Sequence, residues 1–79
     1  MATSPLNDMI DARSKAVRRG LWLEYCAAIC IWAYPHALRA IRLYRKFEKD
    51  MQRRDLAPDQ QFAIVLTAEA ELNELRSED

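Results

Sequence analysis

Two cysteines and one histidine are the residues of this chain best suited to bind a metal or to act as nucleophiles. Cys26 and Cys30 are four positions apart, which places both on one face of a helix. A closed zinc site needs four such ligands, and His36, the only histidine, lies beyond a proline, so no metal site is expected. We interpret the cysteines as small buried hydrophobic residues, because a disulfide between them would span a single helical turn and constrain little.

Other residue types needed for catalysis are sparse. Ser4, Ser14 and Ser77 suggest no arrangement of nucleophile, base and orienting group with His36, which we interpret as a residue at a helix N-terminus. Gly20 is the only glycine, so the chain has no glycine-rich loop for a phosphate. We therefore predict a protein that is not an enzyme and has no cofactor. Two cysteines and the lack of a secretory leader pattern indicate a cytoplasmic protein.

The charges are divided between the two parts of the chain. Residues 1–54 carry eleven basic and five acidic residues, whereas residues 55–79 carry one basic and seven acidic residues, and the net charge is zero. No nucleic-acid motif frames the basic residues and the acidic end weakens their attraction, so nucleic-acid binding is not expected. Either the acidic segment folds back beside the basic one, or the basic face is left for an acidic partner.

Residues 21–34, LWLEYCAAICIWAY, are the most apolar part of the chain, with Glu24 as their only charged residue. Their aromatic side chains, with Arg18 and Arg19 just before them, are typical of a segment at a membrane interface. Fourteen residues are nevertheless too few to cross a bilayer, which takes about 20. A helix that is apolar almost all round has more apolar surface than one neighbouring hairpin can readily cover, so we expect it to be a protein interface, with a membrane contact or the core of its own bundle as the alternatives.

The three prolines predict the helices that carry these residues. Ser4 as an N-cap and Pro5 at the first helical position begin a helix over residues 5–34, and Pro35 stops it, because the residue before a proline disfavours the helical conformation. A second helix is predicted over residues 35–54. Pro58 opens a third helix over residues 58–76. Gly20 is expected to be a weak point in the first helix, costing about 1 kcal/mol relative to alanine.

Apolar residues at steps of three and four predict which faces are buried. The second helix has Ala37, Ala40, Ile41, Tyr44, Phe47 and Met51, the third has Gln61, Val65, Ala68, Leu72 and Leu75, and the start of the first has Met9, Ile10, Ala12, Ala16 and Val17. A short loop makes the second and third helices antiparallel neighbours. We predict an all-α fold, either a three-helix bundle or a helical hairpin packed on a longer first helix. It forms one domain over residues 1–79, with residues 1–4 and 77–79 flexible.

The last part of the sequence resembles a known family. Leu43, Phe47, Glu48, Lys49, Leu56, Ala68, Glu69, Leu72, Glu74 and Leu75 are similar to the second half of the Hha/YmoA family of small helical proteins. That family modulates gene silencing by binding a nucleoid-associated protein, and the resemblance implies that Glu69 matches its partner-binding acidic residue. The resemblance covers less than half of the chain, and residues 21–34 have no counterpart in it.

The size and the apolar segment together predict binding to another protein. A core built from 79 residues is marginal, and a partner or a second copy often supplies the rest. We predict a regulator, inhibitor or adaptor whose anchors are Trp22, Tyr25 and Trp32, with Arg18 and Arg19 at the rim. We also predict a homodimer through the first helix, in which Glu24 lies at the rim or meets Arg18 or Arg19 of the other chain.

Overall fold

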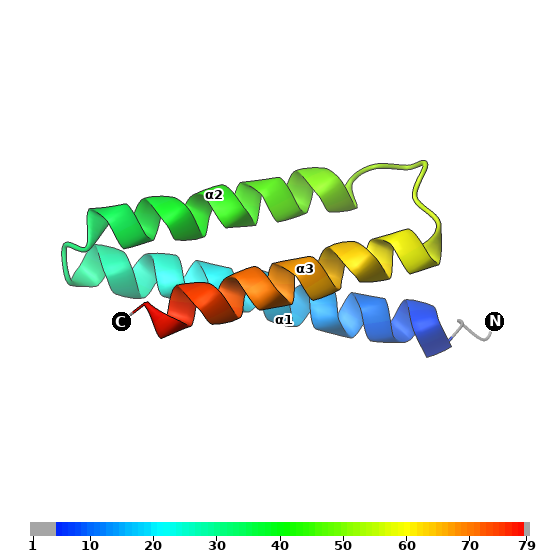
Figure 1. Cartoon of the computed structure of the whole chain (residues 1–79), viewed down its shortest axis with the longest axis horizontal. Helices are drawn as coiled ribbons and strands as arrows, with labels where there is room; N and C mark the ends of the chain where they lie inside the picture. Colours follow the sequence, from blue (N-terminus) through cyan, green and yellow to red (C-terminus); the bar gives the residue numbers. More distant parts are fainter. Residues whose placement is uncertain (1–4, 79) are drawn as a thin grey trace.

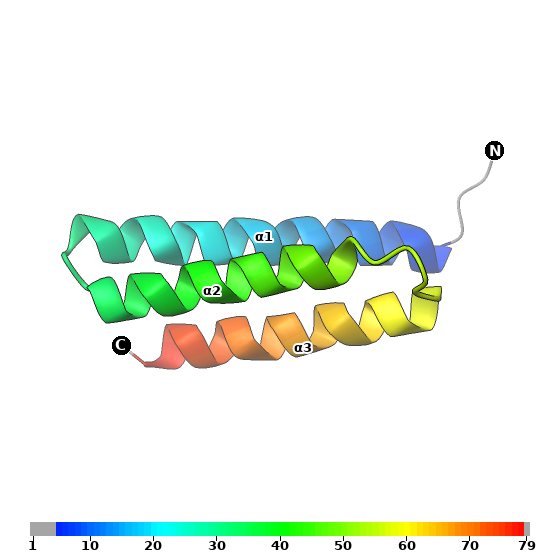
Figure 2. The same cartoon turned by 90° about the horizontal axis from the view of Figure 1, so that it is seen from above.

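Three helices form the structure, a computed structural model that describes residues 5–78 (Figure 1). They are α1 (Pro5–Cys30), α2 (Tyr34–Met51) and α3 (Pro58–Ser77), and each contacts the other two. The chain runs up, down and up along a rod of 46 × 20 × 18 Å (Figure 2), so α3 lies parallel to α1. The predicted all-α three-helix bundle is confirmed, and no strand occurs within residues 5–78. The expected N-cap, Ser4, lies outside the described residues.

The turn between α1 and α2 begins earlier than predicted, because α1 ends at Cys30 rather than at Tyr34. The Ala33 amide donates to the Ala28 carbonyl at 2.8 Å and the Trp32 amide donates to the Ile29 carbonyl at 3.1 Å. Trp32, the donor of the second of these hydrogen bonds, has a φ of 62°. This pattern is a Schellman motif, which ends a helix with one residue in the left-handed conformation.

The second and third helices begin at their prolines, much as predicted. Pro35 is the second residue of α2, where its missing N–H removes no helical hydrogen bond. At the start of α3 the Gln60 side chain accepts a hydrogen bond from the Ala57 amide at 2.9 Å, which satisfies one free backbone donor. The second helix ends at Met51, three residues short of the predicted end.

One apolar face of each helix forms the core. Its buried members are Ile10, Val17, Leu21, Ala40, Phe47, Val65, Ala68, Leu72 and Leu75. The faces predicted for α2 and α3 are confirmed. In the predicted face of α1, Ile10 and Val17 are buried, whereas Met9, Ala12 and Ala16 are exposed.

Gly20 lies where α1 packs against α3. A Cβ atom at this position would lie 2.6 Å from Cδ2 of Leu72 and 2.9 Å from Nη2 of Arg76. Leu72 is itself buried in the core and has little freedom to move away. The expected weak point in α1 is therefore a place where the absence of a side chain lets the two helices pack.

Candidate functional site

The apolar segment is divided between the core and the surface. Leu21 and Ala28 are buried and Tyr25 is packed against the core, but the residues between them face outward. Of the nine large apolar side chains that are exposed among the described residues, seven lie between positions 22 and 38. These seven, which we call the apolar end, are Trp22, Leu23, Ile29, Ile31, Trp32, Tyr34 and Leu38. The exposed apolar surface is thus concentrated around the α1–α2 turn.

Contacts between α1 and α2 show how the apolar end is arranged. An ion pair joins Arg18 to Glu48, and the rings of Trp22 and Tyr44 lie 6.1 Å apart, which sets the antiparallel register. Continuing this register places Ile29 level with the first turns of α2. Trp22 and Ile29 are seven residues apart on α1, as two turns of one helix face require.

The third helix packs on a different side of the α1–α2 hairpin. Toward α3, α1 directs Arg13, Gly20 and Glu24, which meet Glu69, Leu72 and Arg76 respectively. Trp22 and Ile29 point to other directions around the α1 cylinder, because residues two and five positions away from Glu24 do not share its face. Trp22 and Ile29 therefore lie on the face of the hairpin that α3 does not cover.

Trp32 has an unfavourable backbone conformation at the most exposed point of the apolar end. Its side chain is 76% exposed, and its ring contacts that of Tyr34 edge-on with centroids 5.9 Å apart. The left-handed conformation costs a residue with a Cβ atom roughly 1–2 kcal/mol, which is why glycine usually occupies this position of a Schellman motif. Strain that the fold retains at an exposed residue is an indication of function.

The predicted rim and anchor residues lie in different environments. Trp22 is 49% exposed and belongs to the apolar end, as Trp32 does. Tyr25 is half-buried, against the core and 5.4 Å from the Trp22 ring, so it supports Trp22 more than it faces solvent. Arg18 is engaged within the chain: it pairs with Glu48, and its guanidinium lies 5.5 Å from the centroid of the Phe47 ring. Arg19 is exposed.

Glu69, which the family resemblance implies for partner binding, lies on α3. It forms an ion pair with Arg13 of α1 at 3.2 Å, and the Arg13 guanidinium lies over Phe62 at 5.5 Å from the ring centroid. Glu69 thus joins α1 to α3, on a side of the bundle that does not include the apolar end.

Glu24 is paired within its own chain. Its carboxylate lies 3.1 Å from Nε2 of His36 on α2 and 3.4 Å from Nε of Arg76 on α3. The Glu24 carboxylate therefore has basic partners within its own chain, and its expected contact with Arg18 or Arg19 of another chain stays a prediction. These two contacts join all three helices at the level of Glu24. His36 lies in the first turn of α2, as predicted.

The interpretation of both cysteines as buried residues is wrong. Cys26 is half-buried and Cys30 is exposed, because α1 turns only its Leu21 and Ala28 side toward the core. No group of three or more histidine, cysteine or acidic side chains that could hold a metal occurs within residues 5–78. The serines are also separate from any such group: Ser14 is buried and its hydroxyl has no hydrogen-bond partner in the described structure.

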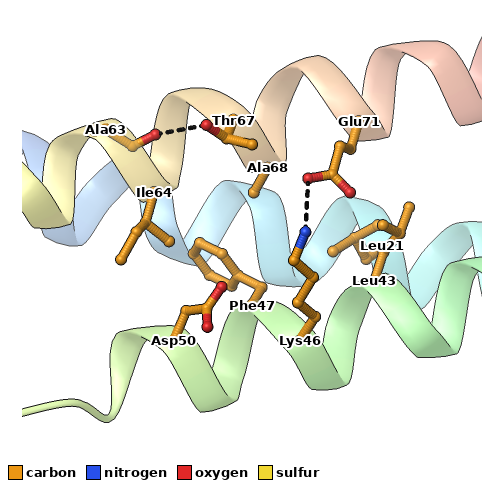
Figure 3. A pocket seen from close by; sticks show the side chains of 10 residues that line it. All are labelled: Leu21, Leu43, Lys46, Phe47, Asp50, Ala63, Ile64, Thr67, Ala68 and Glu71. Carbon is orange, nitrogen blue, oxygen red and sulfur yellow. Dashed lines mark hydrogen bonds and ion pairs between the residues drawn. The ribbon is translucent and has the colours of Figure 1, made fainter.

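A hollow lies between α2 and α3 (Figure 3). Its volume is about 180 Å³, its floor includes Phe47 and Ile64, and an ion pair of 3.6 Å between Lys46 and Glu71 lies at its edge. Ligand pockets usually have volumes of about 300–1,000 Å³, so this hollow has room for a single side chain rather than a cofactor.

Comparison with known proteins identifies no relative: no family model, curated protein or solved structure matches the chain. The resemblance of the last part of the chain to the Hha/YmoA family therefore stays a prediction. None of the helices within residues 5–78 combines the length and the apolar character needed to cross a bilayer.

Proposed function

We propose that this protein is a non-enzymatic regulator, inhibitor or adaptor that binds another protein through its apolar end. The observation that carries the proposal is the concentration of seven exposed large apolar side chains around one turn. Scattered exposed apolar residues are normal, but a contiguous patch usually marks an interaction site. We also propose that the protein is cytoplasmic.

The extent of the apolar end supports this role. If each of its seven side chains offers roughly 100 Å², the patch covers on the order of 700 Å². A stable protein interface buries about 800 Å² on each partner. The apolar end can therefore form the centre of an ordinary interface, with Trp22 and Trp32 as anchors because tryptophan is enriched among the residues that dominate binding energy.

The proposal is tested with the double variant Trp22→Ala/Trp32→Ala. A partner captured from the native host is purified, and its affinity for each variant is measured by calorimetry. Met9→Ala/Leu66→Ala is the matched control, because these are the two exposed large apolar residues outside the apolar end. We expect the tryptophan variant to lose more than about thirtyfold in affinity and the control to lose little. A folded tryptophan variant with unchanged affinity would contradict the proposal.

Two alternatives use the same residues. Residues 21–34 could contact a membrane surface, which flotation with liposomes tests. A second copy could cover the apolar end of the first, as the predicted homodimer through α1 requires, and the pairing of Glu24 within its own chain removes one obstacle to this contact. Sedimentation equilibrium at micromolar concentration distinguishes a 9.2 kDa monomer from a dimer.

A further inference from the structure

Five basic residues have no carboxylate within 4 Å among the described residues. They are Arg19, Arg42, Arg45, Lys49 and Arg54. In contrast, the basic residues that face α3 are paired: Arg13 with Glu69, Lys46 with Glu71, and Arg39 with Glu78. The acidic third helix thus neutralises one side of the basic segment, as one interpretation of the sequence expected, and leaves the other side charged.

Most of these unpaired charges lie beside the apolar end. Leu38, Arg42, Arg45 and Lys49 follow one another at steps of four, three and four, so they form one stripe along α2. All four are exposed, and the stripe lies opposite the buried face of α2. It begins within the apolar end at Leu38 and continues as three basic residues toward the α2–α3 loop.

Arg19 extends the same charge onto α1. The ion pair between Arg18 and Glu48 shows that this part of α1 lies level with the second half of α2. Arg19 follows Arg18 and is exposed, so it adds a fourth positive charge at that level of the hairpin. We call Arg19, Arg42, Arg45 and Lys49 the basic stripe.

Repulsion between like charges opposes the basic stripe in the folded chain, and Lys49, in the last turn of α2 where the helix dipole favours positive charge, offsets part of it. Like charges three or four positions apart on a helix destabilise it, by about 0.2–0.5 kcal/mol for each pair, and Arg42, Arg45 and Lys49 form two such pairs. Glu48, the carboxylate next to Lys49 in sequence, is engaged by Arg18. Arg42 lines the same hollow as Glu71 and Glu74 of α3 without forming an ion pair with either, so acidic side chains from another molecule would compensate the basic stripe more fully.

We propose that the partner contributes an amphipathic helix with apolar side chains in one half and acidic side chains in the other. This inference rests on the proposed function. The apolar half lies against the apolar end and the acidic half against the basic stripe. The surface is long and narrow, because the span from Leu38 to Lys49 alone covers roughly 16 Å of helix. A helix laid along the hairpin matches this shape and brings both halves into contact at once.

Insertion of the turn end-on into a membrane would leave part of the basic stripe without a partner. If the apolar end inserted into a bilayer from the turn, Arg45 and Lys49 would lie roughly 10 and 16 Å farther along α2 than Leu38. The field of anionic lipids falls off over a Debye length of about 8 Å at physiological salt. Much of the basic stripe would then be too far from the lipid headgroups to contribute, whereas an acidic helix would reach all of it.

The experiment selects helical peptides of 18 residues from a displayed library randomised along one face, with the full chain as the target. Three variants of the chain are then compared for each selected peptide. Arg42→Glu/Arg45→Glu reverses two charges of the basic stripe, and Arg53→Glu/Arg54→Glu is the matched control, with the same change in charge in the α2–α3 loop. Trp22→Ala/Trp32→Ala removes the two anchors of the apolar end.

We expect selected peptides with apolar residues in one half and acidic residues in the other. Their affinity should fall by about thirtyfold for Arg42→Glu/Arg45→Glu, should change less than threefold for the control, and should fall as salt is raised. Peptides without acidic residues, sensitive to the tryptophan variant but not to charge reversal, would overturn this inference and leave the proposed function intact. Peptides insensitive to both would contradict both proposals.

Two further measurements identify a different occupant. Phosphatidylglycerol vesicles are tested by flotation with the wild-type chain and the charge-reversal variant, and sedimentation equilibrium is run on the same two proteins. Binding to vesicles that is tighter than to any selected peptide, and that is lost in Arg42→Glu/Arg45→Glu, would overturn the inference in favour of a membrane. A dimer disrupted by the same variant would overturn it in favour of a second copy, and a chain that neither floats nor dimerises supports the acidic helix.

Discussion

Replacing Trp32 by glycine should relieve a backbone strain that alanine at the same position retains, while removing a binding anchor. Trp32 has a φ of 62° and occupies the position of the Schellman motif at which glycine is preferred. Its side chain is 76% exposed and contributes one ring contact, to Tyr34, so the fold depends little on it. Trp32→Gly and Trp32→Ala both lose that contact, and the difference between the two variants isolates the strain of the backbone.

The size of the difference follows from two opposing effects. Alanine retains the left-handed strain of roughly 1–2 kcal/mol, which glycine does not have. Glycine also gives the unfolded chain more freedom, which takes back about 0.4–1 kcal/mol. We therefore expect Trp32→Gly to be more stable than Trp32→Ala by about 0.5–1 kcal/mol. For a domain of this size, that difference raises the Tm by roughly 2–8 °C.

Thermal and urea unfolding followed by circular dichroism measure this difference. Ala33→Gly is the control, because Ala33 has an ordinary φ of −84° and glycine there should lower stability by about 0.5–1 kcal/mol. Both Trp32 variants should bind the partner equally weakly. If Trp32→Ala were as stable as Trp32→Gly, the backbone at Trp32 would not be strained, and the argument that this strain marks a functional residue would fail.

Three further predictions concern the core and the loop. Gly20→Ala should lower the free energy of unfolding by about 1 kcal/mol, because overpacking against Leu72 outweighs the gain in helix propensity. In urea unfolding, the additional change Leu72→Val should recover part of the loss. A Gly20→Ala variant that is more stable than the wild type would contradict the close packing. Ser14→Ala should stabilise the protein by about 1 kcal/mol, since it removes a buried hydroxyl without a partner, and a destabilised variant would mean that the hydroxyl is hydrogen-bonded after all. A hydrogen bond from Arg53 lowers the pKa of Asp55, so Arg53→Ala should raise that pKa toward its ordinary value in an NMR titration. The small stabilisation that the pair provides should be present above the unfolded-state pKa of Asp55. It should be lost as the pH falls through the lower folded-state pKa.

Much of the fold could be predicted from local patterns in the sequence. Pro58 marked the start of α3, and Pro35 lies in the first turn of α2. The spacing of Phe47 on α2 and of Val65 and Leu72 on α3 predicted the buried faces of these two helices, because a helix with a single apolar stripe packs that stripe against the core. The excess of basic residues before position 55 and of acidic residues after it also predicted ion pairs between α3 and the rest of the chain.

The environment of residues 21–34 could not be predicted in the same way. A helix that is apolar all round has no preferred face, so its neighbours decide that Leu21 is buried and Trp22 exposed. The end of α1 could not be predicted either, because Trp32 occupies the left-handed position at which glycine is usual.

The partners of the charged residues depended on the tertiary structure for a related reason. Glu24 meets His36 and Arg76 only because all three helices converge at that level of the bundle. Composition showed only that positive and negative charge are divided between the two parts of the chain. Only the packing of α3 on one side of the hairpin decided that Arg13, Arg39 and Lys46 are paired, while Arg42 and Arg45, a fraction of a turn away on α2, have no carboxylate within 4 Å among the described residues.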